Sequence, residues 1–405
     1  MHGTNDAARG DLSAQHGLTR RGFMWGGGAA VGAFALLLPA GCQVAKATRT
    51  AGGTREGNKL QFGDDARAVD DQQPASAEPR HVHPKRATCL ALTADGSRVT
   101  SDDLGQLVVS KGNAAQPPFK KIHSSEDGKP IKAAYVCVAG NRVLTAGYDG
   151  NVNVHDLSQP ELGNATPMFA GHRLDGKNRE VWVAILTPDG KTALSATNDG
   201  QILLWDANEP GKPASKDYKH PAKTQGGPVG GLAFVPPNSN APTHFLSTCY
   251  RDIHLWDIQD PTKPAFTFTH GNSFAVNAVA VKNDGRKFVS GGFDGTIRVW
   301  DLNVKDIKGL SKTAEKKIKG HKHWVWRVAL SQDARLAASA GQDGAVRIWD
   351  ITGDPIRQVG GDHNPGKGGS MGVVFGPNNT VIYTLDHLDK SVVLTQDTFE
   401  FPQGK

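Results

Sequence analysis

From about residue 83 onward, short runs of apolar residues alternate with polar residues at a period of two. The run Ile-Arg-Val-Trp at 297–300 is an example. This period predicts β-strands whose successive side chains face opposite sides of a sheet. Asp-Gly pairs at 149–150, 199–200, 294–295 and 343–344 lie between such runs and suit the positive φ angles of a tight hairpin. No stretch beyond the N-terminal segment keeps a helical period over three turns, so the sequence predicts antiparallel β-structure.

The strands and hairpins recur as a unit. The clearest copy runs from 319 to 350, and further copies end at 206 and 301. The aspartates that close successive units are Asp156, Asp206, Asp257, Asp301 and Asp350, at steps of 50, 51, 44 and 49 residues. Four short strands cannot bury both faces of their sheet alone, so the units must stack on one another. A ring of such units is a β-propeller.

The motifs within these units resemble the WD40-repeat family over roughly residues 83–398. Gly-His occurs at 171–172 and 320–321, and Trp-Asp at 205–206, 256–257, 300–301 and 349–350. Other units depart from the pattern, with His155-Asp156, Ser110-Lys111 and Gln396-Asp397 in place of Trp-Asp, and His270-Gly271 in reversed order. Counting the starts of inner strands predicts an all-β, seven-bladed WD40 β-propeller at 81–398, with a C-terminal tail at 399–405. Either 80–83 or 398–401 is expected to close the ring.

The resemblance also implies a buried hydrogen-bond network in each well-formed blade, built from the His of Gly-His, a strand Ser, the hairpin Asp and the Trp. The residues concerned are His172, Ser195, Asp199, Trp205, Ser290, Asp294, Trp300, His321, Ser339, Asp343 and Trp349. On another fold, Ser, His and Asp together would suggest nucleophilic catalysis. A constellation that recurs with the repeat favours a structural role, so we predict no catalytic residue.

Partner binding is expected on the top face, which we define as the loops that enter each inner strand together with the hairpins between second and third strands. This placement follows from the resemblance. Aromatic residues and Arg are enriched at binding hot spots. The candidates are Tyr148, Arg179, Asn198, Tyr250, Arg251, Phe274, Phe293, His323, Trp324, Trp326, Gln342 and Leu388.

The N-terminal residues 1–42 predict an export signal. Arg20 and Arg21 precede Phe23 and a mildly apolar run at 29–40, a pattern similar to a twin-arginine (Tat) leader. The segment 38–42 is similar to a lipobox ending in Cys42, although Pro39 departs from it; cleavage after Ala47 is the alternative. Residues 43–80 contain few large apolar residues and predict a flexible linker. We therefore expect an exported protein, either periplasmic or a lipoprotein anchored at the outer face of the membrane through Cys42.

Composition excludes several other classes. The chain has 46 Lys and Arg against 40 Asp and Glu, giving a formal net charge of +6. These charges are scattered rather than gathered in a stripe, so we expect no nucleic-acid partner. The chain contains no CxxC or HExxH motif and no phosphate-binding loop. The histidines recur at equivalent blade positions, which favours structural roles; we therefore expect no cofactor and no metal, although a ligand set in the central channel stays open.

Together these features predict a non-enzymatic scaffold that binds another protein or peptide of the cell envelope through the propeller top face. The alternative is a periplasmic propeller enzyme or ligand binder, such as a hydrolase or lactonase, with a site in the channel. The lack of a non-repeating cluster of acids and histidines favours the scaffold.

Overall fold

The computed structural model describes residues 87–111, 114–115, 123, 132–158, 172–174, 177–209, 211–221, 227–271, 275–363, 370–376, 382–386 and 391–393. The chain divides into two compact units, Met1–Gly32 and Ala33–Lys405. All described residues belong to the second unit. The predicted signal segment, linker, tail and both ring-closing segments lie outside the described residues, as do Phe274 and Leu388.

Antiparallel sheets make up the described part of the chain. Five of the sheets have four strands in sequence order. The first is β1 (Ala87–Leu92), β2 (Arg98–Asp102), β3 (Leu107–Lys111) and β4 (Ala114–Ala115). The second is β10 (Val181–Leu186), β11 (Thr192–Thr197), β12 (Gln201–Asp206) and β13 (Lys216–Lys219). The third is β14 (Leu232–Val235), β15 (His244–Cys249), β16 (Asp252–Asp257) and β17 (Phe266–Thr269).

The remaining two four-stranded sheets lie later in the chain. One is β18 (Val276–Val281), β19 (Lys287–Gly292), β20 (Thr296–Asp301) and β21 (Lys316–Lys319), with the short 3-10 helix η1 (Ile307–Gly309) before its last strand. The other is β22 (Val325–Leu330), β23 (Leu336–Gly341), β24 (Val346–Asp350) and β25 (Arg357–His363). β8 (Arg173–Leu174) and β9 (Lys177–Asn178) form a separate small hairpin.

Two further sheets have three strands each. They are β5 (Ala133–Ala139), β6 (Arg142–Gly147) and β7 (Val152–Asp156), and β26 (Ser370–Phe375), β27 (Ile382–Asp386) and β28 (Ser391–Val393). The prediction of a seven-bladed propeller is therefore wrong for the part of the chain that the structure describes, where five of the sheets have the four strands of a complete blade. Both three-stranded units lack the closing Trp-Asp pair, and in both the segment that would supply a fourth strand falls outside the described residues.

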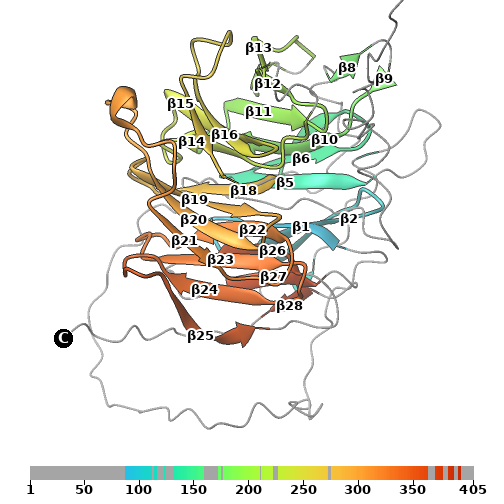
Figure 1. The fold of residues 1–405 in the computed structure, drawn as a ribbon. Helices are drawn as coiled ribbons and strands as arrows, with labels where there is room; N and C mark the ends of the chain where they lie inside the picture. The colour runs from blue at the N-terminus through green and yellow to red at the C-terminus, as the bar shows by residue number, and fades with distance from the viewer. Residues whose placement is uncertain are drawn as a thin grey trace, which may run out of the picture. The chain divides into compact units, whose positions relative to one another are not determined.

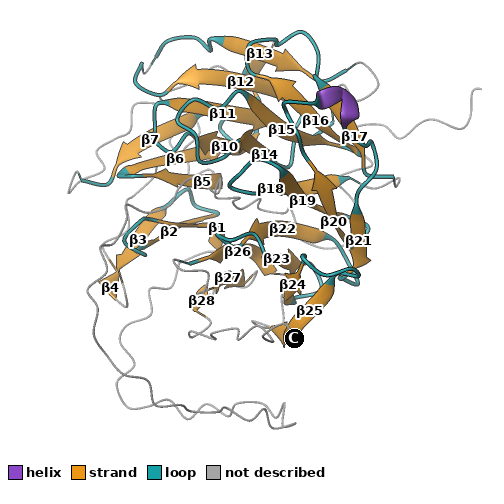
Figure 2. Cartoon of the chain, turned by 90° about the vertical axis from the view of Figure 1, so that its left-hand side faces the viewer, coloured by secondary structure: helices purple, strands orange, loops and turns teal. Residues whose placement is uncertain are grey.

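The sheets pack on one another as a β-propeller. The first strand of each sheet contacts the first strand of the next sheet, and β26 and β27 contact β1. Figure 2 shows the first strands gathered at the centre, with later strands such as β13, β21 and β25 farther out, and Figure 1 follows the sheets in chain order by colour. This stacking buries the apolar faces that a single four-stranded sheet leaves exposed.

The hairpins form as the Asp-Gly pairs predict. Gly150, Gly200, Gly295 and Gly344 have φ angles of 79°, 95°, 74° and 83°, in the region that glycine adopts without steric cost. The aspartate of the pair completes the turn. The Asp294 carboxylate, for example, accepts a bond of 3.0 Å from the backbone N–H of Thr296. This chemistry fixes where the second strand ends and the third begins.

Large aromatic side chains fill the space between neighbouring sheets. Trp300 on β20 stacks on Phe288 of β19 at a centroid distance of 5.5 Å. It also meets Phe268, on the outer strand β17 of the preceding sheet, edge-to-face at 5.6 Å. Trp256 makes the corresponding edge contact with Tyr218 of β13 at 5.6 Å. The Trp of each Trp-Asp pair is therefore a packing element between blades.

Cationic side chains also join adjacent sheets. The Lys216 ammonium at the start of β13 donates to the Ile258 carbonyl at 2.8 Å, and the Lys316 ammonium at the start of β21 donates to the Gly353 carbonyl at 2.9 Å. The acceptors follow the third strand of the next sheet. A charged donor to a backbone carbonyl is among the stronger hydrogen bonds in proteins, so these lysines act as clamps between blades.

Candidate partner-binding face and the buried blade networks

The two sets of top-face residues meet in pairs through backbone hydrogen bonds. The N–H of Phe293, in the β19–β20 hairpin, donates to the Ala275 carbonyl just before β18. In the same way, the N–H of Gln342 donates to the Trp324 carbonyl at 2.8 Å, and the N–H of Asn198 donates to the Glu180 carbonyl at 3.1 Å. Each of these three blades thus sets one hairpin residue against one loop residue, and the two residues lie at the same end of the blade.

Phe293, Trp324 and Trp326 come together with Trp182 to form what we call the aromatic cluster. Phe293 and Trp324 stack with ring centroids 4.4 Å apart, and Trp326 meets both edge-to-face at 5.7 and 5.3 Å. Trp182 packs against Trp326. Trp326 is buried, whereas Trp324 is 37% exposed. The cluster therefore has a buried base and one exposed ring.

β-Bulges place two tryptophans of this cluster, the buried Trp326 and the half-buried Trp182. The pairing of β10 with β11 shifts register between Val181 and Val183, and that of β22 with β23 shifts between Val325 and Arg327. Trp182 and Trp326 are the extra residues at these two shifts. A bulge re-aims the side chain that it carries. Sequence reasoning named Trp326 and missed Trp182, although Val-Trp-Val-Ala at 181–184 parallels Val-Trp-Arg-Val at 325–328.

A fixed carboxylate accompanies the aromatic cluster. Oε2 of Glu180 accepts a bond of 3.0 Å from the Trp182 indole N–H and one of 3.3 Å from the Asn198 side-chain amide. The nearby Arg179 guanidinium pairs instead with Asp199 at 2.8 Å. Glu180 was not predicted from the sequence, since nothing in the repeat pattern distinguishes it from other loop acids.

The other predicted top-face residues lie apart from this cluster. The Tyr148 ring has the Lys132 ammonium 5.0 Å from its centroid. Tyr250 is 39% exposed, with a φ angle of 50°, and its ring lies so close to Gly227 that a Cβ there would come within 2.2 Å. Arg251 and His323 are exposed. These side chains add to the surface of the face without entering the aromatic cluster.

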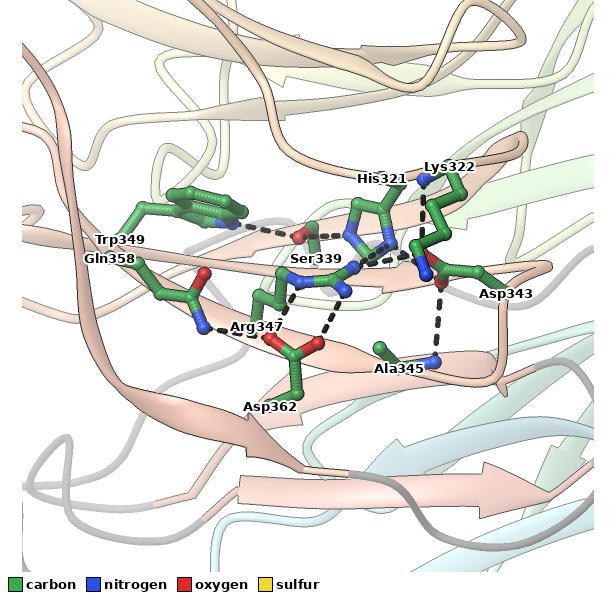
Figure 3. A network of polar contacts seen from close by, with 9 residues as sticks. All are labelled: His321, Lys322, Ser339, Asp343, Ala345, Arg347, Trp349, Gln358 and Asp362. Carbon is green, nitrogen blue, oxygen red and sulfur yellow. Dashed lines mark hydrogen bonds and ion pairs between the residues drawn. The ribbon is translucent and has the colours of Figure 1, made fainter.

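The buried network of the β22–β25 blade is drawn in Figure 3. Nδ1 of His321 lies 2.9 Å from the Asp343 carboxylate and Nε2 lies 2.7 Å from the Ser339 hydroxyl. The Trp349 indole N–H donates to the same hydroxyl at 2.8 Å. The Arg347 guanidinium lies 2.8 Å from the same Nδ1 and donates to the Asp343 carboxylate at 2.9 Å. All three polar groups are thereby satisfied inside the blade.

Two related blades vary this network. Nε2 of His172 lies 2.7 Å from Ser195, which accepts from Trp205 at 2.7 Å, but Nδ1 of His172 contacts Gln201 at 3.3 Å in place of Asp199. The Asp199 carboxylate instead pairs with the Arg179 guanidinium at 2.8 Å. In the β18–β21 blade the Ser290 hydroxyl accepts from Trp300 at 2.8 Å, while Arg298 links His270 to Asp294.

One network was missed at the sequence level. His123 lies 2.9 Å from Asp149 and 3.0 Å from Thr145, and Thr145 lies 3.3 Å from His155. His155 stands where other blades have Trp, and Thr145 stands where they have Ser. The spacing of 22 residues between His123 and Thr145 is close to the 23 between His172 and Ser195, a signal that the missing Gly-His pair concealed.

Burial lowers the pKa of three histidines inside the blades. It lowers the pKa of His172 and of His254 to about 4, and burial beside His123 lowers the pKa of His155 to about 4. Burial alone would raise the pKa of Asp343, but the hydrogen bonds from His321 and Arg347 lower it overall. Histidines with so low a pKa suit a structural role, whereas a general base works best with a pKa near the operating pH.

The described residues hold no group of three or more His, Cys, Asp or Glu side chains arranged to bind a metal ion. They also include no helix long and apolar enough to span a membrane.

The fold and its blade networks define a β-propeller that carries WD repeats. The family model described as "WD domain, G-beta repeat" matches residues 166–206, 262–301 and 312–350. Among curated proteins, the chain is similar to pre-mRNA-processing factor 19 of Caenorhabditis elegans, at 28% identity over 185 residues. That match covers 45% of this chain and 33% of the relative, so the chain spans about a third of the length of that protein.

Proposed function

We propose that the protein is a non-enzymatic protein-binding scaffold of the bacterial cell envelope that holds its partner on the propeller top face. The observation that carries this proposal is the aromatic cluster, in which Trp324 remains 37% exposed above a buried Trp326. Exposed aromatic residues on a rigid base are typical of binding hot spots. The WD repeats support the same class of function, since such propellers present loops on a fixed ring.

Co-purification tests the scaffold. Wild-type protein and Trp324→Ala are purified from the native envelope, and stoichiometric partners are identified in both samples. Lys308→Ala is the matched control, because Lys308 is exposed on η1, which follows the end of β20 farthest from the Asp294 hairpin. Loss of a partner in Trp324→Ala alone supports the scaffold. One equivalent of bound metal without any partner would favour the alternative, an enzyme or ligand binder with a channel site.

We further propose that the protein is exported by the twin-arginine route and anchored through acylated Cys42. The paired Arg20 and Arg21 and the lipobox-like segment support this proposal. Replacing both arginines by lysine should hold the protein in the cytoplasmic fraction. Cys42→Ser should move it from the membrane to the soluble envelope fraction, whereas an unchanged distribution would point to cleavage after Ala47.

A further inference from the structure

The aromatic cluster is joined to a carboxylate by a continuous chain of contacts. Trp324 packs on Trp326, Trp326 packs on Trp182, and the Trp182 indole N–H holds Oε2 of Glu180 at 3.0 Å. The Asn198 amide fixes the same oxygen at 3.3 Å. A carboxylate has further acceptor capacity on its second oxygen. The structure therefore holds an oriented anion against Trp182, at one end of the aromatic cluster.

We infer that this site recognises an arginine side chain of the partner. The inference rests on the proposed function, because it names the group that the top face binds. A guanidinium is planar, so it stacks on a Trp face, and its fork of N–H donors matches a carboxylate. Glu180 supplies the acceptor, the half-buried Trp182 supplies a ring beside it, and Trp324 supplies the exposed ring of the same cluster. Both halves of the requirement are present on one face of the molecule.

Local charges agree with a cationic ligand at Glu180. Arg179 is the nearest cation along the chain, and its guanidinium is paired with Asp199 at 2.8 Å. Arg179 therefore does not neutralise Glu180, which keeps acceptor capacity for a ligand. Lys322 is exposed two residues before Trp324, and its positive charge would weaken the binding of a cation. Removing the positive charge of Lys322 should therefore strengthen the interaction.

Other ligand classes fit less well. An apolar side chain seated on the cluster would take water away from the Glu180 carboxylate without offering a hydrogen bond, which costs free energy. An anionic group would face the same carboxylate with like charge. A lysine ammonium would gain the charge attraction, but it lacks the planar surface that stacks on a Trp ring and the paired donors that match both carboxylate oxygens.

Binding of small probes to the full chain tests the inference. N-acetyl-arginine methylamide, its lysine and citrulline counterparts, and N-acetyl-leucine methylamide are titrated while tryptophan fluorescence is followed. We expect the arginine compound to bind at least about fivefold more tightly than the other three. Glu180→Gln should weaken that binding roughly tenfold, as expected for loss of a charge-assisted hydrogen bond. Lys322→Gln should strengthen it, and Lys308→Ala should leave it unchanged.

The variants separate recognition from folding. Gln at position 180 keeps an amide oxygen to accept from Trp182, so Glu180→Gln should unfold at the wild-type temperature. Equal or tighter binding of the leucine compound, or an unchanged arginine affinity in Glu180→Gln, would overturn the inference. In the native envelope, a partner lost from Trp324→Ala but kept by Glu180→Gln would reject arginine recognition and leave the scaffold standing. Failure to capture any partner would reject the scaffold itself.

Discussion

Phe293 and Trp324 stack at 4.4 Å with their ring planes within 10° of parallel, although they belong to adjacent blades. Phe293 lies in the hairpin of the β18–β21 sheet, and Trp324 lies in the loop that leads into β22. The stack therefore links two sheets at the surface that we propose for partner binding. It also holds Trp324 in one orientation, which lowers the entropy cost of using that ring in an interface.

This stack should be measurable in a double-mutant cycle. We expect Phe293→Ala and Trp324→Ala to be less destabilising together than the sum of their separate effects. The coupling should be about 0.5–1.5 kcal/mol, the usual range for an aromatic pair. Urea unfolding of the four proteins gives the coupling directly. Strict additivity would show that the two rings do not interact in solution.

Loss of the shared Ser339 hydroxyl should destabilise the protein more than loss of the Ser290 hydroxyl. Ser339 bonds both His321 and Trp349, whereas the Ser290 hydroxyl serves Trp300 and His270 is held by Arg298. Removing a hydroxyl leaves each of its buried partners unsatisfied, at roughly 1–3 kcal/mol each. Ser339→Ala should therefore cost about twice as much free energy of unfolding as Ser290→Ala. Chemical denaturation of the two variants compares them, and equal losses would contradict the shared bond.

As the pH is lowered, the protein should begin to lose stability at a pH well above the range in which carboxyl groups titrate. Buried His155, His172 and His254 have a pKa of about 4 when folded, against about 6.5 when unfolded. Between these values the unfolded chain binds more protons, so stability falls as the pH drops from 6.5 toward 4. Each histidine contributes about 1.4 kcal/mol per pH unit within that window. Below it, the lowered pKa of Asp343 acts in the same direction.

Urea unfolding at pH 7.5, 6.0 and 5.0 measures this slope. His155→Trp restores the residue that other blades carry and removes one titrating group, so it should reduce the slope by about one proton. A free energy of unfolding that stays constant from pH 7.5 to 5.0 would contradict neutral burial of these histidines.

The lysine clamp between blades should contribute measurably to stability. Lys316→Met keeps the aliphatic stem but removes the ammonium that donates to the Gly353 carbonyl. We expect a loss of about 1–2 kcal/mol, in the range for a hydrogen bond to a charged group at a half-buried site. Lys317→Met is the matched control, because Lys317 is the next residue along β21 and its side chain is exposed. An equal loss of free energy of unfolding in the two variants would show that the Lys316 clamp does not stabilise the protein.

The repeat pattern predicted the general architecture because its signals are local. Asp-Gly pairs define hairpins and Trp-Asp pairs end third strands, so the sheets around Trp205, Trp256, Trp300 and Trp349 follow directly from the sequence. The number of complete blades did not follow. The units with His155-Asp156 and Gln396-Asp397 were counted as equal to the others, yet their described sheets have three strands.

The site was predictable in position but not in composition. Family geometry placed Phe293, Trp324 and Trp326 on one face, but their contact with Trp182 depends on two β-bulges in distant strands. A bulge is a property of strand pairing and leaves no mark in the alternation of apolar and polar residues. Glu180 was missed for the same reason, because its partners Trp182 and Asn198 become neighbours only when β10 pairs with β11.

The bonds that join each hairpin residue to its loop residue are made entirely by backbone atoms, as between Gln342 and Trp324. Any amino acid other than proline can supply that N–H, and every amino acid has the carbonyl. The side chains on these paired positions can therefore change without loss of the bonds that hold the surface in shape. During divergence, such a ring can acquire new specificities by substitution at these positions alone, while the blades beneath keep folding by the same rules.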